Sequence, residues 1–321
     1  MTDTTNAACG PRPTGGTAPV DPDNLPVVPL RHPGRWVGTA VVMVVLFLVF
    51  KSLATNPAFQ WPLVAKYLFY PTILKGLYTT VLLTVVIMAV AIVLGTVVAI
   101  MRLSPSRLLS APASAFIWFF RGVPALVQLI LWFNLSLVVR EISLTLPWIG
   151  TVFSVETNDF MTPFLSAVLG LAFHEAGYMA EIIRAGISSV SPGQTEAGAT
   201  LGMHRARILQ RIVLPQAMRL IIPPTGNTTI SLLKTTSLVS VIAVTDVLYS
   251  AQVIYTRTFE TVPLLIVVTF WYLAVVSVMS VGQFYLEQYF ARDEQDRARR
   301  SVLQIVSDAM AFGRRDRGAP A

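Results

Sequence analysis

Two long stretches of this chain contain no acidic or basic side chain, and they restrict its fold more than any other feature. They are Gly76–Met101 and Thr261–Leu286, and each is longer than the about 20 residues with which an α-helix crosses a hydrocarbon core. Only helices and closed barrels satisfy their own backbone there, and these stretches lack the alternation of barrel strands. The chain is 54% hydrophobic and 13% charged, too few charges to cover a water-soluble surface. The sequence therefore predicts an integral membrane protein.

Four further segments are candidates for crossing the membrane. They are Trp36–Thr55, Val123–Val139, Phe160–Ala180 and a segment from Leu220 to about Val244. The first two contain one charged residue between them, Lys51, which can extend to the headgroups from a helix end. The last two carry polar side chains, among them His174, Glu175 and Lys234. We therefore expect an all-α, polytopic bundle of about six transmembrane helices.

The distribution of lysine and arginine predicts the orientation. Short cytoplasmic segments of membrane proteins are enriched in these residues. With the N-terminus inside, the outer segments receive only Lys66, Lys75, Arg140 and Arg257, and most arginines fall inside. We therefore expect both termini in the cytoplasm of a multi-pass plasma membrane protein. The net charge of +7 comes from these inner segments, and it therefore does not indicate binding to nucleic acid.

The two ends of the chain are predicted as tails. Residues 1–35 are rich in proline and are expected to form a disordered cytoplasmic tail, and residues 291–321 a basic cytoplasmic tail. Residues 36–55 are expected to form an extra N-terminal transmembrane helix. The alternative is a cleaved signal peptide, because Ser52-Leu53-Ala54 resembles a small-residue cleavage site.

Enzyme motifs are nearly absent. No Gly-Lys pair occurs, so the phosphate-binding loop of an ATPase is missing. His174-Glu175 begins a zinc-protease pattern, but Tyr178 stands where the second histidine is needed. Ser231 and Lys234 fit a Ser-x-x-Lys pair, which leaves a membrane-embedded serine/lysine enzyme as an alternative. With a single cysteine, Cys-based metal motifs are excluded, and we expect neither a metal nor a bound cofactor.

An inner loop of residues 188–219 has the chemistry of two short helices. Ser191 is a good N-cap, Pro192 suits the first helical position, and Gly202 can take the left-handed conformation that ends a helix. The pattern predicts a helix over 192–201 with Glu196 in its first half. A second, basic helix is predicted from about His204 to Val213, stopping before Pro215. The loop is either a docking element or an amphipathic segment on the headgroups.

The sequence of this loop resembles that of a known family. EAGATLGMHRARILQRIVLP (196–215) is similar to the pattern E-A-A-x3-G-x9-I-x-L-P of ATP-binding cassette importer permeases. The matching residues are Glu196, Ala197, Gly202, Ile212, Leu214 and Pro215, with Gly198 where the family usually has alanine. FFRGVPALVQ (119–128), AGYMAEIIRAGI (176–187) and SLLKTTSLVSVI (231–242) resemble segments of the polar amino acid subfamily. The similarity covers about residues 70–290.

The resemblance implies a fold, an assembly and a coupling site. The fold would be that of a type I importer permease of the bacterial inner membrane, with a core of about five helices besides the N-terminal one. The short helix and the segment after it would couple the permease to separate ATPase subunits, which use the ATP. The residues of this coupling site are Glu196, Ala197, Gly198, Gly202, Ile212, Leu214 and Pro215. A second permease subunit (identical or a paralogue), an extracytoplasmic solute-binding protein and membrane lipid are the other expected partners.

The substrate path is expected to use polar groups that hydrocarbon would penalise. Lys234 or Arg121 would bind the carboxylate of a zwitterionic amino acid, and Glu175 its ammonium group. The candidate path residues are Arg121, Gln128, His174, Glu175, Asn227, Ser231 and Lys234. In the alternative interpretation Arg121 anchors its helix at the headgroups. We expect an importer for polar amino acids, and opines or other small zwitterions are the alternative cargo.

Overall fold

The computed structural model describes residues 33–146, 148 and 150–315, and the predicted tail of residues 1–35 falls almost entirely outside them. The chain divides into two units, Met1–Asn56 and Pro57–Ala321. In the first unit, Pro33–Thr55 forms the apolar helix α1.

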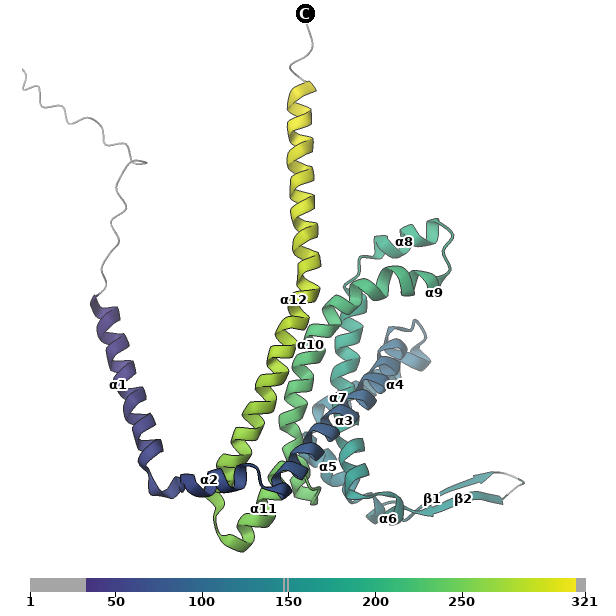
Figure 1. Ribbon diagram of the computed structural model, residues 1–321. Helices are drawn as coiled ribbons and strands as arrows, with labels where there is room; N and C mark the ends of the chain where they lie inside the picture. The colour runs from purple at the N-terminus through teal and green to yellow at the C-terminus, as the bar shows by residue number, and fades with distance from the viewer. Residues whose placement is uncertain (1–32, 147, 149, 316–321) are drawn as a thin grey trace, which may run out of the picture. The chain divides into compact units, whose positions relative to one another are not determined.

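The second unit is mostly helical, as the sequence predicts (Figure 1). Its α-helices are α2 (Trp61–Leu68), α3 (Pro71–Leu103), α4 (Arg107–Gly122), α5 (Ala125–Phe133), α6 (Thr157–Phe160), α7 (Pro163–Ser188), α8 (Pro192–Thr200), α9 (Arg205–Ile208), α10 (Leu214–Thr235), α11 (Val247–Thr258) and α12 (Thr261–Arg315). Short 3₁₀ segments are η2 (Pro57–Phe59), η3 (Leu135–Leu137) and η5 (Thr236–Ile242), and η4 (Leu209–Val213) is a π-helical turn.

One element was not anticipated from the sequence. The predicted outer loop after the third apolar segment contains an antiparallel hairpin, β1 (Glu141–Leu146) paired with β2 (Gly150–Glu156). Glu141 lies opposite Glu156 at the base of the hairpin, and the register shifts after Leu144.

Helix α7 is the centre of the bundle. It packs against α3, α4, α5 and α10, and its buried face includes Leu171, Ala176 and Met179. Gly95 of α3 lies against this face, where an added Cβ would stand 2.6 Å from the Cβ of Met179. Small residues of this kind let membrane helices approach closely. A second apolar cluster joins α2, α11, α12 and the start of α3.

The number of clear spans is smaller than the sequence predicts. In the described residues, α1, α3 and α12 are long and apolar enough to cross a membrane, and two bent helix pairs raise the number to five. Helix α7, which contains the fourth predicted segment, is not among them, because His174, Glu175, Glu181 and Arg184 make it polar. The helix itself is nevertheless formed without interruption.

The third predicted span is bent rather than straight. Val123–Val139 was expected to cross as one helix, but α4 and α5 form a pair that bends by 102°. Pro124 explains the break, because the residue before a proline is pushed out of the helical region, and Val123 is extended (φ −92°, ψ 133°). The paired segment starts at Arg107, earlier than predicted.

The amide of Gln128 holds this bend. Its Nε2 donates to the carbonyl oxygens of Phe120 (2.9 Å) and Val123 (2.8 Å), which have lost their helical partners at the end of α4. The same nitrogen lies 3.1 Å from Nδ1 of His174 on α7. The Gln128 side chain is 2% exposed. It therefore satisfies the freed backbone inside the protein, as a membrane requires.

We predict that Gln128→Leu destabilises the protein by about 1–3 kcal/mol, because two buried carbonyl groups lose their donor. The thermal midpoint of the purified permease, followed by size-exclusion chromatography, measures the effect. Asn134→Leu is the matched control, since the Asn134 amide also donates to a backbone carbonyl, that of Ile130, but is exposed. Equal midpoints for the two variants would contradict the role of Gln128.

Candidate functional site

The helix predicted over 192–201 is α8, and its end has a defined geometry. Gly202 has φ +73°, its N–H donates to the carbonyl of Ala199 (2.9 Å), and the N–H of Met203 donates to the carbonyl of Gly198 (3.0 Å). These two bonds form a Schellman motif, which satisfies carbonyl groups at the end of a helix. At the other end, Ser191 is the N-cap residue, but its side chain makes no capping hydrogen bond. Helix α8 is therefore held mainly at its C-terminal end.

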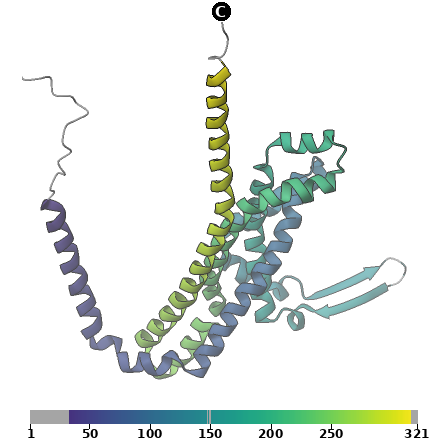
Figure 2. The same cartoon turned by 45° about the horizontal axis from the view of Figure 1, so that its top comes forward.

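Gly198 fixes α8 to the segment that follows. It is buried, and an added Cβ would lie 3.1 Å from side-chain carbons of both Ile208 and Ile212. A glycine in a helix interior costs about 1 kcal/mol relative to alanine. Here the missing side chain lets α8 approach α9 and η4 closely, and Figure 2 shows the two helical segments side by side.

The opposite surface of α8 is open to solvent. Glu196 and Ala197 are exposed, and Leu201, the residue after the helix, is 81% exposed. Arg205 and Arg207 of α9 are exposed as well. The result is a short, fixed helix with a carboxylate and an apolar residue on its free face.

The basic helix after α8 does not stop before Pro215. Helical structure runs from Arg205 through η4 and α10 to Thr235, with Pro215 in the first turn of α10. The wide π-helical turn before Pro215 accommodates a residue that lacks an N–H. The amide of Gln216 donates to the carbonyl of Ile212 at this junction (2.7 Å). Ile212 is half-buried, whereas Leu214 and Pro215 are exposed.

Three predicted path residues come together beside α7. The amide of Gln128 contacts His174, whose ring centroid lies 5.3 Å from that of Tyr178. The guanidinium carbon of Arg121 lies 5.1 Å from the centre of the Tyr178 ring. The sequence did not single out Tyr178 as a contact residue, although its position four residues after His174 on one helix face was a usable signal.

Glu175 and Glu181 of α7 differ in their environment. Glu175 is 6% exposed, and its carboxylate has no hydrogen-bond or ion-pair partner among residues 33–146, 148 and 150–315. Glu181 pairs with Arg184, three residues later on the same helix, at 2.8 Å. A buried carboxylate without a partner is costly, and this distinguishes Glu175 from the paired Glu181.

The remaining path residues form a separate stripe. Asn227, Ser231 and Lys234 are exposed and lie four and three residues apart, on one face of α10. Within the described parts of the chain, no hydrogen bond or ion pair joins this stripe to the side chains beside α7. The structure therefore divides the predicted path residues into two groups, one beside α7 and one exposed on α10.

Comparison with known proteins identifies the family of the chain. Residues 91–292 match the family model of the binding-protein-dependent transport system inner membrane component. The chain is 40% identical over 296 residues to the arginine transport system permease protein of Corynebacterium glutamicum, covering 92% of each chain. It is 36% identical over 211 residues to the nopaline transport system permease protein of Agrobacterium fabrum, covering 66% of this chain and 84% of the relative.

The solved structures give the same answer for the fold. The crystal structure of an amino acid ABC transporter with histidines superposes with a TM-score of 0.58 at 31% identity, covering 69% of this chain and 95% of the other. The family match spans more than half of the chain. This chain therefore belongs to the inner membrane components of binding-protein-dependent transport systems, as a transport permease with the type I importer fold.

Proposed function

We propose that the chain is the permease subunit of an importer for polar amino acids and that α8 couples it to a separate ATPase. The observation that carries this proposal is the construction of α8. It is closed by the Schellman motif at Gly202, pressed onto Ile208 and Ile212 through Gly198, and otherwise free. A helix fixed on one side and open on the other suits a groove on a partner protein.

The same construction connects α8 mechanically to α10. Helix α8 is attached to α9 and η4, which continue into α10 without a break at Pro215. A push on α8 would therefore move α10 and its polar stripe together. Alternating access needs such an element with two packings, biased by ATP and by the loaded solute-binding protein.

The orientation follows from this assignment. In Figure 1, α8 and α9 lie at one end of the second unit, and α2, α6 and α11 lie at the other. With α8 facing a cytosolic ATPase, the hairpin lies outside, and we propose from the charge distribution that both termini are cytoplasmic. The excess of arginine on the α8 side supports this orientation.

The α10 stripe supports a paired assembly. Lysine at the centre of a membrane helix costs about 2.5–3.5 kcal/mol on insertion scales, so an exposed Lys234 is unfavourable against lipid. We propose that Asn227, Ser231 and Lys234 face a cavity shared with a second permease subunit, identical or a paralogue. Lys234 would bind the substrate carboxylate there, and the unpartnered Glu175 would attract the ammonium group.

Two observations bear on the alternatives. The similarity to a nopaline permease favours an opine as the second candidate cargo. The enzyme interpretation receives no support from the comparisons, because the family and the relatives are transport permeases.

Glu196→Arg tests the coupling assignment. We expect it to reduce ATP-driven uptake of radiolabelled amino acid by at least tenfold, because it reverses the charge on the free face of α8. Uptake into proteoliposomes containing the permease, its ATPase and its binding protein is the measurement. Asp159→Arg, the same reversal at an exposed position on α6, is expected to leave uptake near normal. Equal uptake by both variants would remove α8 from the mechanism.

Lys234→Met tests the polar stripe and Ser231→Ala tests the enzyme alternative. We expect Lys234→Met to abolish most uptake while the protein folds normally, since methionine keeps the length and loses the charge.

Ser231→Ala is expected to retain at least half of the uptake. If Ser231→Ala lost uptake at normal expression while Lys234→Met stayed active, the enzyme alternative would be favoured over the role of Lys234 in substrate binding.

A further inference from the structure

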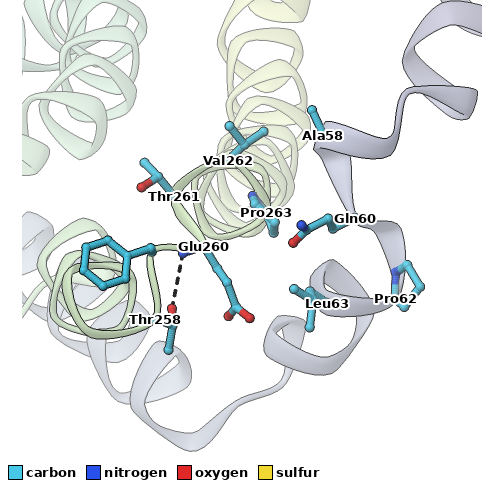
Figure 3. Close-up of a pocket in the computed structure, with 10 residues that line it drawn as sticks. Ala58, Gln60, Pro62, Leu63, Thr258, Glu260, Thr261, Val262 and Pro263 are labelled. Atoms are coloured by element: carbon cyan, nitrogen blue, oxygen red, sulfur yellow. Dashed lines mark hydrogen bonds between the residues drawn. The ribbon is translucent and has the colours of Figure 1, made fainter.

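The described residues that line one surface pocket include none of the candidate site residues discussed so far. The pocket has a volume of about 560 Å³ and lies between the start of α2 and the turn from α11 to α12 (Figure 3). Gln60, Pro62 and Leu63 line one side, and residues 258–263 line the other. In Figure 1 these elements are at the end of the second unit opposite α8.

The carboxylate of Glu260 is the charged group of this pocket. Its Oε2 is buried and has no hydrogen-bond partner in the described residues. Burial raises the pKa of the Tyr67 hydroxyl, and its hydrogen bond to the Glu260 carboxylate raises that pKa further. Tyr67 can donate only one hydrogen bond, so half of the carboxylate still needs a donor. Among the residues that the structure describes, no lysine or arginine lines the pocket.

The walls of the pocket are held in unusual backbone conformations. Gln60 has φ 44° and Phe259 has φ 60°, left-handed values that residues other than glycine rarely adopt. Such conformations cluster where a site must be shaped. The Phe259 side chain is 88% exposed, next to the carboxylate, and an aromatic ring beside a carboxylate favours a cationic ligand.

The surroundings favour a protein side chain as the source of the cation. Phe259, Thr258 and Arg257 are exposed on the turn, which gives a broad surface around the pocket. Aromatic residues are enriched at protein–protein interfaces. In the proposed orientation this end of the molecule faces outward, where the expected partner is the solute-binding protein.

We propose that the pocket receives a lysine or arginine side chain of the extracytoplasmic solute-binding protein, with Glu260 as its counter-charge and Phe259 packing against it. The inference rests on the proposed function, because it needs that partner on this side of the membrane. Docking at the pocket would place the partner on the α11–α12 turn, directly connected to α12.

The test uses the full complex of permease and ATPase in lipid nanodiscs. The affinity of the purified binding protein and the basal ATPase rate are measured for the wild type, Glu260→Gln and Glu260→Lys. We expect binding to weaken at least fivefold in Glu260→Gln and further in Glu260→Lys, with the basal ATPase rate unchanged. Asp159→Lys, the same charge change outside the pocket, should bind like the wild type.

A second variant controls for loss of binding through misfolding. Phe259→Gly suits the left-handed backbone and removes the ring, so binding should weaken without loss of thermal stability. Unchanged binding in Glu260→Gln and Glu260→Lys would overturn the inference, as would an equal loss in Asp159→Lys. The inference would also be overturned if free arginine stimulated the ATPase in the absence of the binding protein and Glu260→Gln abolished that stimulation.

The experiment also separates this inference from the proposed function. If the wild-type complex binds the solute-binding protein and imports amino acid while all Glu260 variants bind equally well, only the pocket assignment fails. If the wild type neither binds it nor imports amino acid, the proposed function itself fails.

Discussion

Backbone groups freed by a break in a membrane helix must find partners inside the protein, and the second unit is organised around this constraint. At the bend between α4 and α5 the amide of Gln128 replaces the missing helical donors. Between α10 and α11 the N–H of Val247 donates to the hydroxyl of Thr80 on α3 (3.1 Å), and Asp246 accepts from the N–H of Tyr249 (2.7 Å). Each break is thus tied to a neighbouring element rather than left flexible.

These ties place the functional groups. Because Gln128 holds the bend, His174 and Arg121 meet beside Tyr178, and because the helix continues through Pro215, α8 is joined to the stripe on α10. The proposed cytosolic contact and the proposed substrate contacts are therefore parts of one connected set of helices. The buried, unpartnered Glu175 lies on the helix that packs against most of that set.

The sequence predicted the features that depend on local chemistry. Unbroken apolar stretches indicated α3 and α12, and Ser191, Pro192 and Gly202 indicated α8 to within a residue. The sequence did not predict the features that depend on contacts made only in the folded protein. The helix breaks at Pro124 but continues through Pro215. The π-helical turn before Pro215 and the hydrogen bond of Gln216 account for this difference. The role of Gln128 depends on carbonyl groups that only the folded bend presents.

Site-directed labelling of α8 tests the central claim most directly. Cys9 is the only cysteine, so Cys9→Ser with Ala197→Cys leaves one thiol, on the exposed face of α8. In membrane vesicles of known orientation, we expect a membrane-impermeant maleimide to label it only from the cytosolic side, and the ATPase subunit to protect it. Labelling from the outer side, or equal labelling with and without the ATPase, would contradict the account.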